Sequence, residues 1–336
     1  MGRLIHRGFV LLVLVTFAPS LGAVGYVVPP GDLEATLASA APGDTLRLEA
    51  GVHRGPITIS TQVHLIGDPG AIIQGANHGT TLILAADGIS VRGLTVRGSG
   101  ADLSRDDAVV LIDRSSNVTV ENCRVEARGF GIYLKAGGEH RIINNEISGD
   151  PALPIARRGN GIHLWHTENN IVQDNHLVDV RDGIYLSFAH DNLIHRNEGA
   201  TLRYGIHYMY SERNTLTENR FTACTGGIAL MFSMKNRIAS NELTDNEQFG
   251  LLCQQLEHSL LEDNYLAGNG RGFYIQNSAA NEFIGNRLEG NGVGAYLTAG
   301  SERNLFTMNR FDGNLVQVFE DHPGDHSGAN AFFRAG

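Results

Sequence analysis

Two methionines and a histidine lie where a single soft metal ion could contact all three. His207 and Met209 are two residues apart, so on a β-strand their side chains point to the same side. Met231 follows Met209 by about 22 residues, and Met234 comes shortly after it. Thioether sulfur and imidazole nitrogen are donors that suit Cu(I). These four residues are the candidate metal ligands.

Three further histidines lie earlier in the same part of the chain. His163, His166 and His190 could extend such a site, and they are secondary candidates. The same residues also fit a second interpretation, in which the methionines form an apolar stripe that docks a partner protein, because Met packs adaptably. The residues alone leave both interpretations open.

A Gly-Ile-x-Leu motif, repeated with substitutions, positions these side chains. It begins at Gly131, Gly161, Gly183, Gly205, Gly227, Gly250, Gly272 and Gly294, and an earlier coil begins at Ala108. A period of about 22 residues without a helical pattern is typical of stacked β-coils. The sequence therefore predicts an all-β protein, a single-stranded right-handed parallel β-helix over residues 24–320.

Alternation along each motif assigns the two faces of the coil. Ile and Leu point into the core, and the residue between them points to solvent. The residues two and four after each start form two outward columns, and neither column contains Asp or Glu. The first column is Val110, Tyr133, His163, Tyr185, His207, Ala229, Leu252, Tyr274 and Tyr296. The second is Ile112, Lys135, Trp165, Ser187, Met209, Met231, Gln254, Gln276 and Thr298.

Asparagine recurs at two further places in each coil. One column lies nine residues after the start and includes Asn117, Asn170 and Asn214; the other lies fourteen after it and includes Asn122 and Asn219. Asn tolerates left-handed turns and bonds to neighbouring backbone, so these columns predict corners joined by ladders of amide hydrogen bonds.

The two ends of the chain differ from the repeat. Residues 1–23 have Arg3 and Arg7 before an apolar run and small residues near Ala23, which predicts a cleaved signal peptide. The segment Asp32–Ser39 predicts a short helix that caps the first coil, with Asp32 as its N-cap. Residues 321–336 form a polar tail.

Composition limits the possible partners. The net charge of −10 argues against nucleic acid, because phosphate binding requires a basic surface. Cys123, Cys224 and Cys253 are an odd number at unrelated spacings, so each is expected to be a small buried residue.

The outward columns also argue against an enzyme. Glycoside hydrolysis requires a pair of carboxylates, and the carboxylates nearby are Asp102, Asp106 and Asp107 in a loop and Asp182 alone at a turn. We therefore expect no catalytic activity. The alternative is a carbohydrate-binding or carbohydrate-modifying β-helix, such as a polysaccharide lyase, hydrolase or epimerase.

Two of the coils carry a more specific pattern. The segment from Gly205 to Ser211 reads Gly-Ile-His-Tyr-Met-Tyr-Ser, and Ala229 to Ser233 reads Ala-Leu-Met-Phe-Ser. Together with the segment from Arg92 to Asp102, they resemble the NosD family of nitrous oxide reductase maturation proteins, over about residues 26–318. The family usually continues beyond the last coil, whereas this sequence stops at Gly336.

The resemblance carries functional expectations. It implies a periplasmic accessory protein that assists copper delivery to the copper–sulfur centre of nitrous oxide reductase, with sulfur as a second candidate cargo. It implies transient Cu(I), and as partners the reductase, an ABC transporter and a copper chaperone lipoprotein. Carried over residue by residue, it points to His207, Met209 and Met231, as copper ligands or as part of a docking surface.

Overall fold

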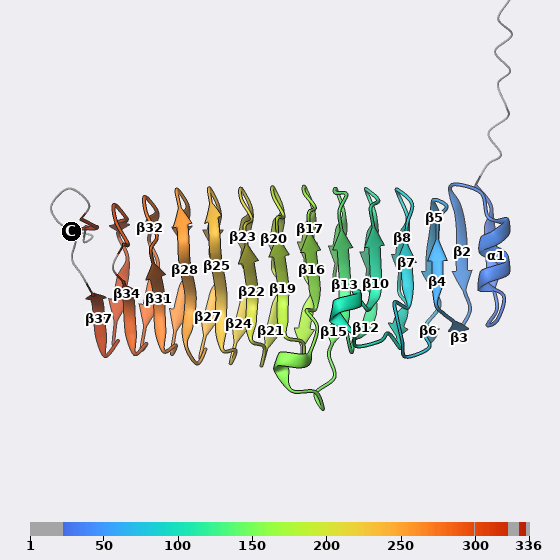
Figure 1. The fold of residues 1–336 in the computed structure, drawn as a ribbon, viewed down its shortest axis with the longest axis horizontal. Coiled ribbons are helices and arrows are strands. Elements are labelled where there is room, and N and C mark those ends of the chain that lie inside the picture. Colours follow the sequence, from blue (N-terminus) through green and yellow to red (C-terminus); the bar gives the residue numbers. More distant parts are fainter. Residues whose placement is uncertain (1–22, 299, 322–328, 334–336) are drawn as a thin grey trace, which may run out of the picture.

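The computed structural model describes residues 23–298, 300–321 and 329–333, and these form an elongated stack of parallel coils (Figure 1). The predicted right-handed parallel β-helix is confirmed: each coil adds one strand to each of three long sheets, here called A, B and C. The signal peptide predicted over residues 1–23 falls almost entirely outside the described residues.

Sheet A contains β1 (Gly25–Val28), β2 (Asp44–Leu48), β5 (Val63–Gly67), β8 (Ser90–Arg92), β11 (Thr119–Glu121), β14 (Arg141–Ile143), β17 (Ile171–Gln173), β20 (Leu193–His195), β23 (Thr215–Thr217), β26 (Arg237–Ala239), β29 (Leu260–Glu262), β32 (Glu282–Ile284), β35 (Leu305–Thr307) and β38 (Ala331–Phe333). Sheet B contains β3 (Gly51–Arg54), β6 (Ala71–Gln74), β9 (Thr95–Arg97), β12 (Arg124–Glu126), β15 (Glu146–Ser148), β18 (His176–Val178), β21 (Glu198–Ala200), β24 (Arg220–Thr222), β27 (Glu242–Thr244), β30 (Tyr265–Ala267), β33 (Arg287–Glu289) and β36 (Arg310–Asp312). Sheet C contains β4 (Ile57–Ile59), β7 (Leu82–Leu84), β10 (Ala108–Asp113), β13 (Phe130–Lys135), β16 (Ile162–Trp165), β19 (Asp182–Ser187), β22 (Tyr204–Met209), β25 (Gly226–Met234), β28 (Phe249–Glu257), β31 (Arg271–Gln276), β34 (Val293–Leu297) and β37 (Val316–Glu320).

The repeated motif forms sheet C. Ile184, Ile206 and Ile228 pair in one register along β19, β22 and β25, and all three are fully buried. The motif glycine also faces inward, because a Cβ on Gly205 would lie 2.1 Å from the ring of Phe221. The strand pairing skips this glycine, so the residue before it and the residue two after it both lie on the outer side.

Asparagine ladders join the corners of the coils. The Asn219 side chain donates to Asn241 Oδ1 at 2.9 Å and to the carbonyl of Ile194, and both asparagines are fully buried. These ladders are confirmed, because each buried amide satisfies backbone groups that the turn leaves unpaired. A third ladder, from Asn246 to Asn314, was not predicted. Its spacing of about one coil is visible in the sequence.

The register of the earliest predicted coil is wrong by one residue. β10 pairs Leu111 with Tyr133, so Val110 and Ile112 lie in the core instead of facing outward. A shift of one residue exchanges the two faces of a strand. The same shift places Asn117 and Asn122 at exposed left-handed corners, with φ of 55° and 54°. Val118 and Cys123 occupy the ladder positions instead.

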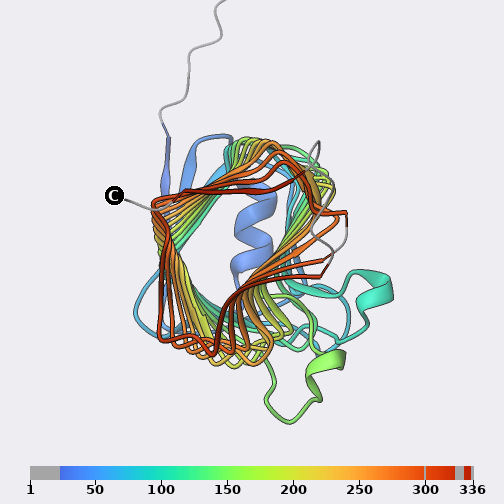
Figure 2. The same cartoon turned by 90° about the vertical axis from the view of Figure 1, so that its left-hand side faces the viewer.

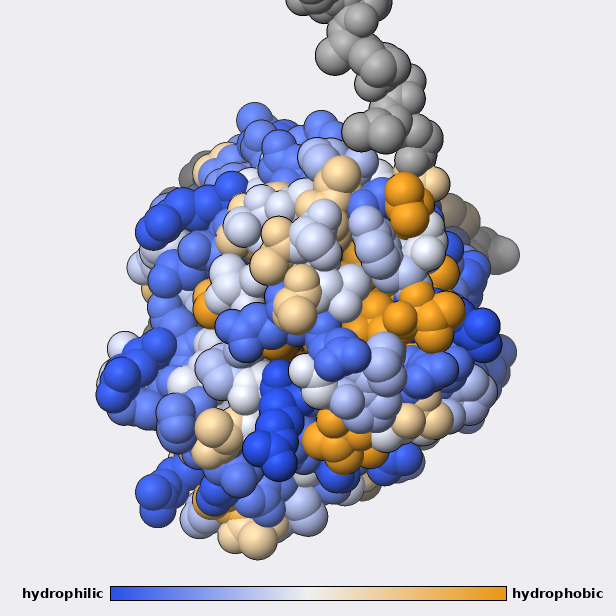
Figure 3. Space-filling model, turned by 90° about the vertical axis from the view of Figure 1, so that its right-hand side faces the viewer, coloured by the Kyte–Doolittle hydropathy of each residue, from blue (hydrophilic) through white to orange (hydrophobic). Residues whose placement is uncertain are grey.

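The N-terminal end is covered by helix α1 (Leu33–Ser39), as predicted. Leu33 is buried, and the helix lies across the end of the core in Figure 2. Asp32 precedes the helix, but its side chain makes no capping bond; its carbonyl accepts from the Thr36 amide instead. Seen from outside, this end is largely hydrophilic, with separate apolar patches (Figure 3).

The C-terminal end carries more exposed apolar surface. Leu315 is 89% exposed, and Phe319 and Phe333 are also exposed. β38, within the segment predicted to be a polar tail, pairs with β35 and continues sheet A.

Two loops leave the stack near its middle, on the same side of the cross-section (Figure 2). One contains the 3₁₀ helix η1 (Leu103–Arg105), and the other contains η2 (Ile155–Arg157). Within the described ranges, no helix has the length and apolar character needed to cross a bilayer.

Candidate functional site

The outer face of sheet C is more covered than the sequence predicts. The first outward column was expected to face solvent, yet Tyr133, His207, Ala229 and Leu252 are buried. Large side chains stacked at the strand spacing cover one another, and residues that precede the motif glycine, such as Tyr204, pack beside them. The column still lies outside the core, but it is a second packed layer.

Met209 and Met231 lie side by side on this face. They are direct register partners on β22 and β25, and both side chains are half-buried. Met231 packs at the edge of a small apolar cluster around Ala229, Phe249 and Leu252. The two sulfur-bearing side chains are therefore neighbours, partly accessible and set against apolar surface.

Met234 lies past the corner that ends the straight part of β25. Phe232 forms this corner with φ of 53°, so the chain turns between Met231 and Met234. Met234 pairs in register with Glu257 and is half-buried. The structure thus separates Met234 from the Met209–Met231 pair by one corner.

His207 contacts a carboxylate that the sequence did not connect to it. Its Nδ1 lies 3.1 Å from Oδ2 of Asp182, which was predicted to stand alone at a turn. Asp182 is the first residue of β19, and it is fully buried. Arg203 donates to both carboxylate oxygens, from Nε at 2.7 Å and from Nη2 at 2.6 Å. We refer to Asp182, Arg203 and His207 as the acidic cluster.

These partners keep the Asp182 carboxyl group ionised. Burial alone would raise the pKa of the Asp182 carboxyl, but hydrogen bonds from His207 and Arg203 outweigh burial, and the pKa lies below its ordinary value. The hydrogen bond to Asp182 raises the pKa of Arg203. The acidic cluster therefore contains an ionised carboxylate that is fully buried on the outer face of sheet C.

Both ends of the His207 imidazole are enclosed. The ring packs edge-on against Tyr185 at 4.9 Å and against Tyr204 at 5.1 Å. Its Nε2 is buried and has no hydrogen-bond partner. The ring therefore leans toward the start of β22, whereas Met209 lies two residues nearer its end.

The secondary candidates lie in two places: His166 and His190 line one pocket at the corner, and His163 lies in the outward column of sheet C. His163 occupies the same column as His207, two coils away, stacked on Tyr133 at 4.5 Å. Burial lowers the pKa of His163 to about 3, so its imidazole is neutral. His190 lies past the corner, where its Nδ1 accepts the amide of Glu212 at 3.2 Å.

His166 belongs to a ladder of aromatic rings along the corner. It stacks on Phe188 at 4.8 Å, Phe188 stacks on Tyr210 at 5.2 Å, and Tyr210 stacks on Phe232 at 5.0 Å. All four residues have left-handed φ between 49° and 53°, a conformation that bulky side chains rarely adopt. This corner ladder runs beside Met209 and Met231, and the sequence analysis did not identify it.

The loop carboxylates have structural partners. Asp102 accepts the Ser104 amide and so caps η1, Asp106 pairs with Lys135 at 2.7 Å, and Asp107 accepts the Asp102 amide. Asp113 pairs in register with Lys135 on the outer face. Asp113 and Asp182 both lie on the outer face, so the prediction that this face carries no Asp or Glu is wrong. Asp113 was missed because the first coil is shifted by one residue, and Asp182 was missed because it lies in the column just before the motif glycine.

The three cysteines are free and buried, as predicted. Burial raises the pKa of the Cys123 and Cys224 thiols to about 11. Within the described part of the chain, no three His, Cys, Asp or Glu side chains are grouped to bind a metal ion.

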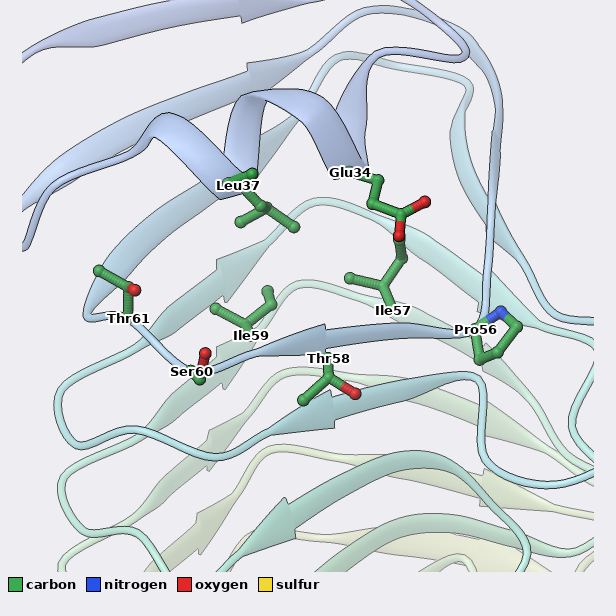
Figure 4. Close-up of a pocket in the computed structure, with 9 residues that line it drawn as sticks. Glu34, Leu37, Pro56, Ile57, Thr58, Ile59, Ser60 and Thr61 are labelled. Carbon is green, nitrogen blue, oxygen red and sulfur yellow. The ribbon is translucent and has the colours of Figure 1, made fainter.

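A pocket of about 350 Å³ lies between α1 and β4, far from these residues (Figure 4). Glu34 is its one ionisable side chain among Leu37, Ile57, Ile59 and small polar residues. It offers little chemistry beyond the contact between the cap helix and the first strand of sheet C.

Residues 143–328 match a family model described as "Periplasmic copper-binding protein (NosD)". Two relatives carry the name "Probable ABC transporter binding protein NosD". The one from Stutzerimonas stutzeri is 41% identical over 288 residues, which cover 81% of this chain and 66% of the relative. The one from Pseudomonas aeruginosa is 42% identical over 286 residues, which cover 81% of this chain and 67% of the relative. The match thus spans about two thirds of their length.

Solved structures share the fold at low sequence identity. A surface adhesin of Streptococcus pneumoniae, PfbA, has a TM-score of 0.70 at 12% identity, covering 87% of this chain and 94% of its own. The A-module of a mannuronan C-5 epimerase of Azotobacter vinelandii has a TM-score of 0.66 at 12% identity, covering 89% of this chain and 92% of its own. An adhesin and an epimerase share this architecture, so the fold alone selects no function.

Proposed function

This chain belongs to the NosD family, and from that premise we propose that it is a periplasmic accessory protein that carries Cu(I) during maturation of nitrous oxide reductase. The description of the family as periplasmic and copper-binding supports the compartment and the cargo. The name of the two relatives supports association with an ABC transporter. The reductase and a copper chaperone lipoprotein complete the proposed set of partners.

The observation that carries the proposal is the Met209–Met231 pair. Two thioethers in direct register are about one strand spacing apart, roughly 5 Å between Cα atoms, so their flexible side chains can converge on one ion. Sulfur donors favour Cu(I) over Ca²⁺ and Mg²⁺, which prefer oxygen. Half-burial leaves the pair within reach of a protein that gives or takes the ion.

The other proposed ligands supply the remaining donors. His207 lies on the same strand as Met209, and its Nε2 has no protein partner. Nε2 is buried and the rings of Tyr185 and Tyr204 pack against the imidazole, so an ion reaches this nitrogen only when neighbouring side chains move. Met234 is available after the corner. A site with few strong ligands and without a buried thiolate suits an ion that must be released again.

A paired substitution tests the proposal. In a Met209→Leu/Met231→Leu variant, Leu keeps the apolar bulk and removes the sulfur. We expect Cu(I) binding, measured in competition with bicinchoninate, to weaken at least tenfold, and copper loading of the reductase in cells to fall. Met308→Leu is the matched control, because Met308 is exposed outside the site. If Cu(I) binding is unchanged in the double variant, the two methionines are not copper ligands, and the interpretation that they dock a partner protein remains.

The second candidate is a carbohydrate-modifying enzyme. It is favoured by the acidic cluster, in which a buried carboxylate, an arginine and a histidine lie beside two tyrosines. We nevertheless propose that the chain is not an enzyme, because the Asp182 carboxylate already accepts hydrogen bonds from both Arg203 and His207. Incubation with alginate and pectin should give no products, whereas turnover that disappears in Asp182→Asn would reverse the choice.

A further inference from the structure

The acidic cluster controls which nitrogen of His207 can bind an ion. Nδ1 has two neighbours, Asp182 Oδ2 at 3.1 Å and Arg203 Nη2 at 3.3 Å. A carboxylate only accepts, so contact with Asp182 requires a proton on Nδ1. Contact with Arg203 would require the opposite tautomer, in which Nδ1 accepts.

The geometry favours the carboxylate as the partner of Nδ1. Arg203 Nη2 already donates a hydrogen bond to Asp182 at 2.6 Å, so its contact with His207 is the longer and weaker of the two. A lone pair on Nδ1 would face an oxygen of an ionised carboxylate, which is repulsive. Nδ1 therefore carries the proton and donates a hydrogen bond to Asp182.

This arrangement leaves a lone pair on Nε2. That atom is buried, it has no hydrogen-bond partner, and its residue is only 8% exposed. Tyr185 and Tyr204 pack edge-on to the ring. A histidine that binds a metal through one nitrogen usually donates from the other to a carboxylate or carbonyl, which fixes the ring and makes it a better ligand.

We infer that Asp182, held in place by Arg203, is a positioning residue that fixes His207 as the Nδ1–H tautomer and so directs Nε2 to Cu(I). This inference rests on the proposed function, and it adds residues that the sequence analysis did not assign to the site. It also explains why a carboxylate is buried on the outer face: an acceptor must approach Nδ1 from the neighbouring coil.

The tautomer of the metal-free wild-type protein is the first test. With 15N-labelled histidine, long-range 15N–1H correlation spectra separate the two tautomers, and His207→Gln identifies the signal among the 14 histidines. We expect a protonated Nδ1 and, on addition of Ag(I) as a substitute for Cu(I) that resists oxidation, a shift of the Nε2 resonance. A protonated Nε2 in the metal-free protein would overturn the inference. The tautomer is read from the wild-type protein, and His207→Gln serves only to assign the signal.

Asp182→Asn is the second test, measured by Cu(I) competition with bicinchoninate. We expect affinity to fall about 10- to 100-fold, the usual effect of losing such a partner. Asp191→Asn is the matched control, because Arg213 donates to Asp191 in the same bidentate way at 2.8 and 2.7 Å, and among the described residues no histidine donates a hydrogen bond to that carboxylate. The control should bind Cu(I) like the wild type.

The outcomes separate this inference from the proposed function. If the wild type binds no Cu(I), the proposed function fails and this inference fails with it. If His207→Gln weakens binding but Asp182→Asn does not, copper binding stands and the positioning role of Asp182 is wrong. If both variants lose affinity and the Asp191→Asn control does not, both statements stand.

Discussion

Ile206 and His207 are adjacent on β22, and they represent the two faces of the same sheet. On the inner face, successive coils repeat nearly the same residue: Ile184, Ile206 and Ile228 are all fully buried in one register. On the outer face, the same register passes from Tyr185 to His207 to Ala229.

The difference follows from what each face must satisfy. Every inner side chain packs against the coils before and after it, so a change of volume or polarity is costly. Outer side chains need only cover their neighbours, so coils can differ without disturbing the stack. The acidic cluster is an exception, because its carboxylate is on the outer face yet fully buried. Variants can test whether stability follows this division.

The largest effect is expected inside. Ile206→Asp places a charge in the core without a partner, and we expect a loss of more than about 4 kcal/mol, or failure to fold. Urea unfolding followed by circular dichroism measures it. Met209→Leu, three residues later on the outer face, should change stability by less than about 1 kcal/mol. Comparable losses for the two variants would contradict the division between faces.

Removing a partner of Asp182 in the acidic cluster should lower the free energy of unfolding nearly as much as a change in the core. Arg203→Met leaves the Asp182 charge buried with one partner fewer, and we expect a loss of about 3 kcal/mol. A double variant, Asp182→Leu/Arg203→Met, should regain most of it. The exposed pair Asp191–Arg213 is the control, and Arg213→Met should cost about 0–1 kcal/mol. Equal losses in the two arginine variants would show that burial of Asp182 has no influence.

One of the asparagine ladders also contains a pH-sensitive group. His140 is fully buried in an asparagine ladder, where its Nδ1 accepts the Val118 amide, and burial lowers its pKa to about 4. The unfolded chain binds this proton near pH 6.5, so stability falls as pH drops from 6.5 to 4, by roughly 1.4 kcal/mol per unit at most. His140→Asn introduces the residue that most other coils have at this position, and it should flatten the slope. An unchanged slope would show that other groups cause the pH dependence.

A single asparagine of a ladder should contribute less to the free energy of unfolding than the core residue Ile206. Asn241→Leu removes bonds to the carbonyls of Leu216 and Ala239 and leaves buried groups unpaired, which costs about 1–3 kcal/mol. Thermal unfolding of this variant is compared with that of the wild type. A melting temperature equal to that of the wild type would show that the ladder does not stabilise the coils.

The smallest effect is expected at the corner ladder. Phe188→Asn removes ring stacking on His166 and on Tyr210 but relieves a bulky residue from φ of 49°. Each stacked pair is worth about 0.5–1.5 kcal/mol and the left-handed strain about 1–2 kcal/mol, so we expect a net change near zero by urea unfolding. A loss above about 2 kcal/mol would indicate that the rings serve stability.

Much of the fold could be predicted because the repeat constrains it. The spacing of the motif alone gives the parallel register, the buried Ile column and the ladders through Asn219. The earliest coil could not be aligned in the same way, because it lacks the motif glycine and both alignments place apolar residues inside. The cap helix was predictable from Leu33 and Leu37, although the bond that begins it is made by backbone and not by the Asp32 side chain.

The candidate site was less predictable, for a geometric reason. The spacing correctly placed Met209 beside Met231, because both occupy one column. It could not connect Asp182 with His207, since that contact joins different columns of adjacent coils and depends on the skipped glycine and on the tilt of the ring. Side-chain directions across columns are not encoded in a single repeat.

The chain also carries an optical probe beside the proposed copper ligands. Trp165 is its one tryptophan, and it occupies the column that continues through Ser187 to Met209. Its indole packs edge-on to His166 at 4.3 Å and lies 5.9 Å from the ammonium of Lys135. Tryptophan emission from this protein therefore reports one face of three neighbouring coils, and its quenching could follow arrival of an ion at Met209 without any added label.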